Sequence, residues 1–138
     1  MSEQQMVEDV FVREFVHHSK KRRVQEALRN KKGREKFRAK LFHFSDFDKR
    51  WMQMIEPAKQ NSKDVLELLK MNGAGSSCHL ISAWTNLDGA CWDLKQTLNT
   101  IIGYYPGTIV ICSPSNLAYF EGEMKCDRYI LLKRKGKF

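Results

Sequence analysis

TIVIC, at residues 108–112, is an unbroken run of apolar or β-branched residues, with Gly107 before it and Ser113-Pro114 after it. Such a run between turn-forming residues predicts a buried central strand. A second apolar run at residues 77–84 predicts another buried strand. Between the two runs a helix is expected to open at Asp88, because apolar residues recur there every three or four positions. These residues are Leu87, Cys91, Leu94, Leu98 and Ile101.

Two strands joined by one helix predict a right-handed crossover between parallel strands. Further strand-like runs at residues 117–123 and 127–135 follow a turn at residues 113–116, and they predict an antiparallel meander with residues 108–112. The expected fold class is therefore α+β. We expect N-terminal helices packed on one face of a small mixed sheet, which is built from a β-α-β crossover and the meander.

The first half of the chain has helical periodicity. We expect helices over about 4–17, 20–30 and 34–44, with a break at Gly33, because apolar residues recur at helical spacing in each. A short helical turn is expected before Pro57, through Trp51 and Ile55, and a further helix follows Ser62. The expected organisation is one domain over residues 1–138. Its residues 1–72 are helical, and its residues 77–138 form β-α-β-β-β.

Composition limits the class of protein. The chain has 138 residues, which suffices for a core without disulfides or metals. No apolar run approaches the length of a membrane span, and the polar start of the chain does not resemble a secretory signal, so we expect a cytoplasmic protein without a membrane partner. The four cysteines form no C-x-x-C pair, which argues against a zinc site; neither a metal nor a cofactor is expected.

Positive charge is concentrated in one segment. Residues 20–40 hold 11 of the 24 Lys and Arg residues and only two acids, Glu26 and Glu35, a formal charge of about +9. The other 117 residues are nearly neutral, with 13 basic and 14 acidic side chains. A localised basic segment indicates a partner, whereas dispersed charge mainly favours solubility.

Nucleic acid is the first partner to consider, because each cation placed on a phosphate backbone releases a counterion. No row of Asn or Gln suited to reading bases is present, so contacts to the backbone are expected. The expected phosphate-contacting residues are Lys20, Lys21, Arg22, Arg23, Lys31, Lys32, Arg34 and Arg38. An acidic protein partner, or a plain solvated surface, remains an alternative.

Catalysis has weaker support. Glu123-x-Lys125 after a predicted strand is similar to half of a metal-dependent nuclease site, which needs another acid on a neighbouring strand. The preceding predicted strand, residues 108–112, has no acid, and Asp88 lies one element earlier; Glu121 is a further candidate acid, and His79 is the candidate histidine. Cys78 and His79 are poorly suited to a nucleophilic pair, because adjacent residues of a strand point to opposite faces. We expect most aromatic side chains to be packing residues, although rings such as Phe120 could stack on bases.

Several motifs resemble those of a group of small bacterial proteins of uncharacterised function. They are LFHFSDFD at residues 41–48, LDG at 87–89, GTIV at 107–110, AYFEGE at 118–123 and RYIL at 128–131. The resemblance implies a bacterial cytoplasmic protein and carries no activity. By analogy, small families of this sort often belong to defence or toxin–immunity systems.

We therefore expect a non-enzymatic binding module that engages a polyanion, with nucleic acid first, through the basic segment. The first alternative is an interaction or immunity-type protein that binds an acidic partner. The second alternative is a metal-dependent hydrolase or nuclease that uses Asp88, Glu121, Glu123, Lys125 and His79. Sequence alone does not specify the ligand or the oligomeric state.

Overall fold

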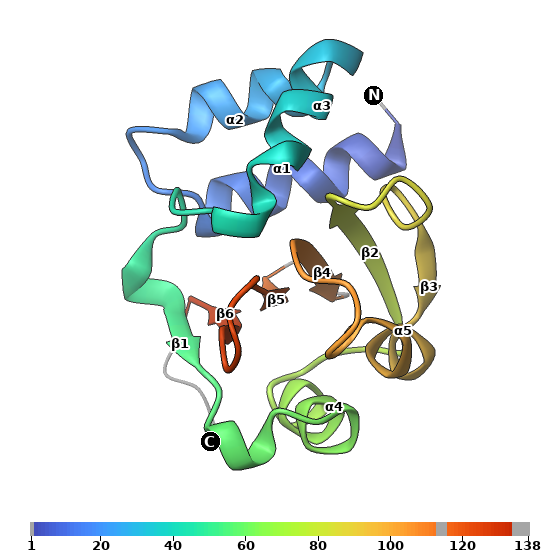
Figure 1. The fold of residues 1–138 in the computed structure, drawn as a ribbon. Helices are drawn as coiled ribbons and strands as arrows, with labels where there is room; N and C mark the ends of the chain where they lie inside the picture. Colours follow the sequence, from blue (N-terminus) through green and yellow to red (C-terminus); the bar gives the residue numbers. More distant parts are fainter. Residues whose placement is uncertain (1, 113–115, 134–138) are drawn as a thin grey trace.

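A six-stranded sheet forms the middle layer of the protein, with helices on both of its faces (Figure 1). The structure is a computed structural model that describes residues 2–112 and 116–133. The strand order is β1-β6-β5-β4-β2-β3, and every neighbouring pair is antiparallel. The strands are β1 (Met52–Met54), β2 (Ser77–Ser82), β3 (Cys91–Asp93), β4 (Thr108–Cys112), β5 (Leu117–Glu121) and β6 (Arg128–Leu132).

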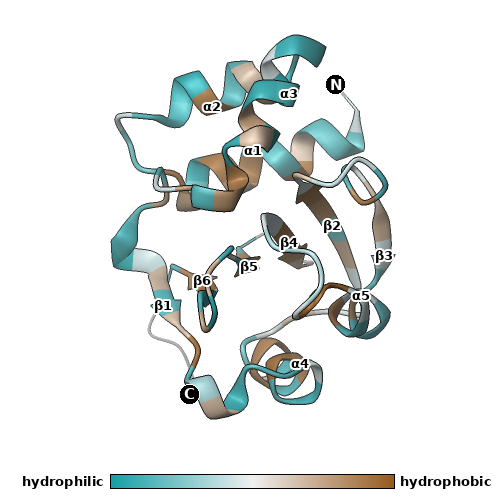
Figure 2. Cartoon of the chain, viewed as in Figure 1, coloured by the Kyte–Doolittle hydropathy of each residue, from teal (hydrophilic) through white to brown (hydrophobic). Residues whose placement is uncertain are grey.

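Alternating side chains of the central strands pack into two separate hydrophobic cores, one on each face of the sheet. In β4, Ile109 and Ile111 face one core, while Val110 and Cys112 face the other. The first core is completed by α1 (Glu3–Phe15), α2 (Lys21–Leu28) and α3 (Lys31–Ala39), and the second by α4 (Ser62–Met71) and α5 (Leu94–Ile101). All five side chains of β4 are buried, as the run at 108–112 predicts. The hydropathy colouring shows brown central strands between amphipathic helices (Figure 2).

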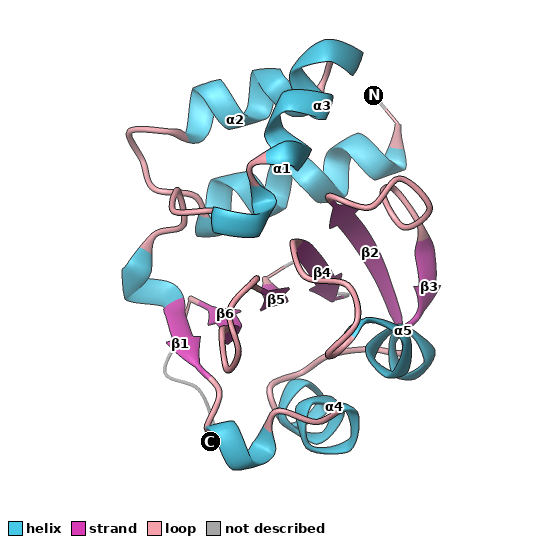
Figure 3. Cartoon of the chain, viewed as in Figure 1, coloured by secondary structure: helices cyan, strands magenta, loops and turns pink. Residues whose placement is uncertain are grey.

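The α+β class is thus present, but two details of the expected topology are wrong. Helices cover both faces of the sheet rather than one, and β2 pairs with β4 in the antiparallel sense, so no parallel crossover exists between them. The cause is β3, the edge strand beside β2, whose end runs into α5 (Figure 3). With both β3 and α5 between them, β2 and β4 run in opposite directions. A single connecting helix would have left the two strands parallel.

The expected helix from Asp88 begins six residues later than predicted, because local chemistry stops it. Gly89 has a φ of +80°, a left-handed conformation that ends helical geometry. Asp93 then caps α5, since its side chain accepts a hydrogen bond from the Gln96 backbone N–H at 3.0 Å. The turn expected at Trp51–Ile55 is likewise shorter: residues 49–51 form a 3₁₀ turn and β1 pairs with β6.

The basic segment forms a helical hairpin, which we call the basic hairpin (residues 20–40). The break between its helices lies at Arg29-Asn30, and Gly33 lies inside α3 rather than ending a helix. Asn30 caps α3 by accepting the Gly33 N–H at 2.7 Å. A Cβ on Gly33 would lie 3.0 Å from the Ala27 backbone, so glycine allows α2 and α3 to approach closely. Among the described residues, no helix has both the length and the apolar character that crossing a membrane requires.

Candidate functional site

Arg34 of the basic hairpin lies in a cluster of ion pairs beneath the helices. Its guanidinium donates to both oxygens of Glu8 on α1, at 2.7 and 2.8 Å, and to both oxygens of Asp88, at 2.8 and 3.1 Å. A fifth bond, at 3.4 Å, reaches the Leu28 carbonyl. These bonds use all five N–H donors of the side chain.

The charges of this cluster stabilise one another. Burial alone would raise the pKa of Glu8, but the hydrogen bonds from Arg34 and His79 outweigh it and hold that pKa below its ordinary value. Burial likewise opposes the charged form of Arg34, yet Glu8 and Asp88 raise the pKa of its guanidinium. Glu8 and Arg34 are therefore both charged at neutral pH.

Arg38 connects α3 to the loop after β2. It donates to the Ser82 carbonyl at 2.7 Å, the Ala83 carbonyl at 3.3 Å and the Thr85 hydroxyl at 3.2 Å. Its Nε also lies 3.5 Å from Asp88. Two of the eight expected phosphate contacts, Arg34 and Arg38, are thus engaged inside the protein, where they anchor the basic hairpin to the sheet.

The other six expected contacts lie at the surface of the basic hairpin. Arg22, Arg23, Lys31 and Lys32 are exposed, and Lys20 and Lys21 are half-buried. Arg22 pairs with Glu26 on the same helix, at 3.2 Å and with both side chains largely exposed. Within the described chain, no ion pair engages Lys31 or Lys32, nor the exposed Lys36 and Lys40 of the same hairpin. The list of predicted contacts omitted these last two lysines.

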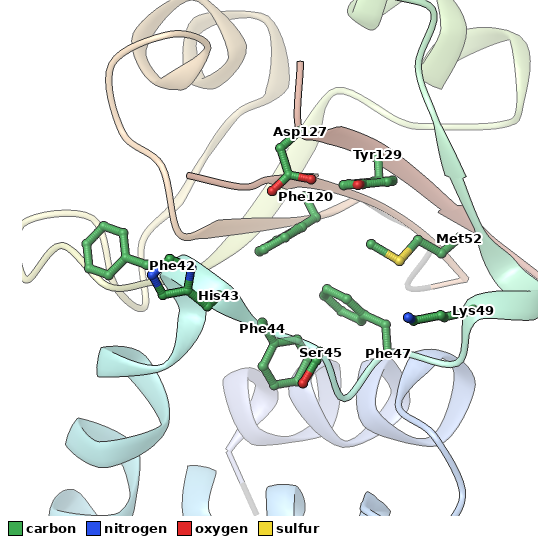
Figure 4. Close-up of a pocket in the computed structure, with 10 residues that line it drawn as sticks. All are labelled: Phe42, His43, Phe44, Ser45, Phe47, Lys49, Met52, Phe120, Asp127 and Tyr129. Atoms are coloured by element: carbon green, nitrogen blue, oxygen red, sulfur yellow. The ribbon is translucent and has the colours of Figure 1, made fainter. Parts of the chain in front are cut away.

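A pocket with aromatic walls lies immediately after the basic hairpin in the chain. It has a volume of about 360 Å³. Figure 4 shows its side chains around an open space, with Phe120, Asp127 and Tyr129 on one side and Phe44 and Phe47 on the other. The complete lining is Phe42, His43, Phe44, Ser45, Phe47, Lys49, Met52, Phe120, Asp127 and Tyr129. We call this space the aromatic pocket.

The rings of the aromatic pocket form a continuous row. Phe44 meets Phe47 edge-on at 4.6 Å between centroids, Phe47 meets Phe120 at 5.1 Å, and Phe120 stacks on Tyr129 at 6.4 Å. Phe47 and Phe120 are buried, whereas Phe44 and Tyr129 are only partly covered. The Asp127 carboxylate raises the pKa of the Tyr129 hydroxyl to about 12, so this wall of the pocket carries a neutral phenol beside a carboxylate.

A second pocket adjoins the aromatic pocket and shares Ser45, Phe47 and Lys49 with it. Its other lining residues are His17, His18, Lys20, Asp46, Asp48 and Arg50. The Arg50 side chain donates to Asp48 at 2.7 Å and lowers the pKa of that carboxyl to about 2. Asp48 is therefore paired with the exposed Arg50, and the pocket also contains two lysines, the half-buried Lys20 and the exposed Lys49.

The weak catalytic candidates do not form one cluster. Buried Glu121 accepts hydrogen bonds from the Tyr119 hydroxyl, the Gly103 N–H and Arg128, on the side of the sheet covered by α5. Glu123 is exposed and pairs with His43 at 2.8 Å, and Lys125 is exposed.

Asp88 and His79 instead belong to the Arg34 cluster, where both reach Arg34 or its partner Glu8. Within residues 2–112 and 116–133, no group of three or more His, Cys, Asp or Glu side chains is arranged to hold a metal ion. The carboxylates therefore have separate structural partners in the described chain.

Sequence reasoning missed two parts of this region. Glu8 is buried on the same face of α1 as Phe11, Val12 and Phe15, so an acid at helical spacing within an apolar stripe was the available signal. The aromatic pocket combines residues 42–52 with residues 120–129. Its Phe-rich half was visible in the sequence, but the pairing with β5 and β6 was not.

Comparison with known proteins identified no matching family model, no matching curated protein and no matching solved structure. The resemblance to small bacterial proteins therefore stays a prediction.

Proposed function

We propose that the protein is a binding module for nucleic acid, in which the basic hairpin holds the phosphate backbone and the aromatic pocket receives an unstacked base. One observation carries this proposal: the basic hairpin begins at one of the two adjoining pockets, and the chain enters the other pocket two residues after the hairpin ends. Lys20, the first residue of the basic hairpin, lines the second pocket, which also contains Lys49 and Arg50. Phe42, which lies two residues after Lys40, lines the aromatic pocket. Cations and aromatic rings on one path are the combination that single strands require.

Charge supports the same partner. Lys31, Lys32, Lys36 and Lys40 are exposed, and no ion pair with a described residue competes for them. Arg34 binds Glu8 of α1 and Arg38 binds the Ser82 carbonyl of β2, so the helix that carries the exposed lysines is anchored to the rest of the protein. Because the helix backbone is already anchored, binding of a phosphate backbone would have to order only the lysine side chains.

Base stacking separates a single strand from other polyanions. The partly covered Phe44 and Tyr129 can offer ring faces to a base, and a stacked base contributes about 1–3 kcal/mol. The pocket volume of about 360 Å³ lies within the range of small-molecule sites and is large enough for a planar base. A duplex keeps its bases stacked internally, so a single strand is the preferred form.

Charge removal with a matched control tests the role of the basic hairpin. We expect Lys31→Gln, Lys32→Gln and Lys36→Gln together to weaken binding of a fluorescein-labelled single strand and to reduce its salt slope by about 2, since each lost contact removes about 0.7. The control removes the same charge from the opposite side of the sheet through Lys59→Gln, Lys63→Gln and Lys95→Gln, and should change the slope little. Equal losses in both variants would show that only net charge matters, and would contradict a site on the basic hairpin.

Phe44→Leu tests the aromatic pocket. We expect it to weaken single-strand binding by about 1–3 kcal/mol while binding of heparin, a polyanion without bases, stays unchanged. Equal losses for both ligands, or none for the single strand, would argue against base stacking. An acidic protein partner would be favoured instead by a nuclease-resistant complex that depends on the same lysines.

A further inference from the structure

Cys91 lies on the free edge of the sheet, with its thiol beside a buried histidine. β3 pairs only with β2 in the described sheet, and Cys91 is exposed. The antiparallel register sets Cys91 directly opposite His79, so the two side chains lie on the same face. The Sγ atom of Cys91 is 3.4 Å from Nδ1 of His79.

The other ring nitrogen of His79 fixes its tautomer. Nε2 lies 2.7 Å from Oε2 of Glu8, and Arg34 and His79 hold the pKa of that carboxyl below its ordinary value. An ionised carboxylate only accepts hydrogen bonds, so Nε2 carries the proton. In the neutral imidazole, Nδ1 then presents its lone pair to Cys91, and the thiol donates to it.

Cys91, His79 and Glu8 thus form a thiol, a proton acceptor and a carboxylate that orients the acceptor, which is the arrangement that activates nucleophiles. We propose that Cys91 is a reactive thiol, with His79 as its proton acceptor, and that it undergoes exchange with small disulfides. This inference does not depend on the proposed nucleic-acid binding.

The exchange balances without any further reagent. As the Cys91 sulfur attacks one sulfur of a disulfide RSSR, its proton passes to Nδ1 of His79. A new S–S bond forms between Cys91 and one R–S group, and the old S–S bond breaks. The departing thiolate RS⁻ takes up a proton, which restores neutral His79, so that the products are a mixed disulfide and RSH.

The other cysteines supply comparisons within the same molecule. Cys78 and Cys112 are buried, and burial raises the pKa of both thiols, so they should not exchange in the folded protein. Cys126 is half-buried, and no described histidine contacts it. It reports how a thiol with partial access reacts without a proton acceptor.

The test compares native and unfolded wild-type protein at neutral pH. Exchange with bis(2-hydroxyethyl) disulfide, an uncharged reagent, is followed at each cysteine by peptide mass spectrometry. An activated Cys91 should exchange on the order of 10-fold faster in the native protein than in urea, because unfolding removes His79. A native rate equal to or below the rate in urea would overturn the proposal.

His79→Gln gives the second measurement, since a Gln amide can still donate to Glu8 but cannot accept the thiol proton as a base. With the circular dichroism spectrum unchanged, the Cys91 rate should fall to its value in urea, while the Cys126 rate stays the same. An unchanged Cys91 rate in the folded variant would overturn the proposal. If the variant does not fold, the comparison of native and unfolded wild type decides the matter alone.

Discussion

Glu8 is the residue on which the packing of the basic hairpin depends most directly. It accepts two hydrogen bonds from Arg34 and one from His79, and its side chain is about 3% exposed. A buried ion pair stabilises little relative to apolar residues, but removing one member leaves the other charge uncompensated. Glu8 therefore matters mainly because its removal would leave Arg34 with one carboxylate partner, Asp88, in place of two.

Glu8→Gln should lower the free energy of unfolding by about 3 kcal/mol, measured by urea denaturation at neutral pH, because Arg34 loses one of its two carboxylates. Glu35→Gln is the matched control, since Glu35 is exposed on α3 and forms no ion pair with a described residue. The control should change stability by less than about 0.5 kcal/mol. A similar loss for both variants would contradict the role given to Glu8.

The contribution of Glu8 should depend on pH in a defined direction. Its folded pKa lies below the ordinary value of 4.5, so its stabilising effect is complete above that value and is lost as the pH falls through the folded pKa. The difference in unfolding free energy between wild type and Glu8→Gln should therefore shrink below about pH 4.5. The groups that lower the pKa of Glu8 are Arg34 and His79, and the variant retains both. A difference that stays constant from neutral to acid pH would contradict this assignment.

At the scale of elements, the short strand β3 explains why the central strand was predicted correctly but the topology around it was not. Residues 108–112 were identified as a central strand because a run of β-branched residues favours a strand over a helix or a loop. The three residues of β3 gave no comparable signal, and Cys91 also fitted the helical repeat from Leu87 to Ile101. Missing β3 changed the predicted relation of β2 and β4 from antiparallel to parallel.

The same limit applies to the candidate site. The cationic segment was visible as composition, so the basic segment could be predicted, whereas the Phe-rich stretch at residues 42–47 gave no prediction of a pocket. Pairing across the sheet could not, because the sequence does not set the register of distant strands. His79 was thus considered with its neighbour Cys78, which lies on the opposite face, rather than with Cys91 across the strands.

The close approach of α2 and α3 gives a prediction at this scale. Gly33→Ala should gain up to about 1 kcal/mol in helix propensity, but its Cβ would lie 2.9 Å from the Asn30 side chain and 3.0 Å from the Ala27 backbone. Because overpacking costs about 1–3 kcal/mol, we expect a net loss of stability in urea denaturation. Lys32→Ala, on the exposed side of α3, is the control and should be nearly neutral. A stabilised Gly33→Ala variant would mean that the two helices do not pack this closely.

For the whole molecule, the sheet separates two different kinds of surface. The face covered by α4 and α5 holds the buried Glu121 and Tyr119, whose contacts are structural. The face covered by α1, α2 and α3 holds the buried ion cluster, the basic hairpin and the aromatic pocket. The binding that we propose would therefore use one side of the molecule, with the sheet and the other helices as its support.

The central claim is that this side binds single-stranded nucleic acid, and a salt titration of the wild-type protein tests it most directly. Fluorescence anisotropy of one labelled strand, alone and as a duplex, would be followed from low to moderate salt. We predict tighter binding of the single strand and a logarithmic salt slope of about −4, as about six phosphate contacts require. No binding of either form at low salt would contradict the claim and leave the basic hairpin as a surface for a protein partner.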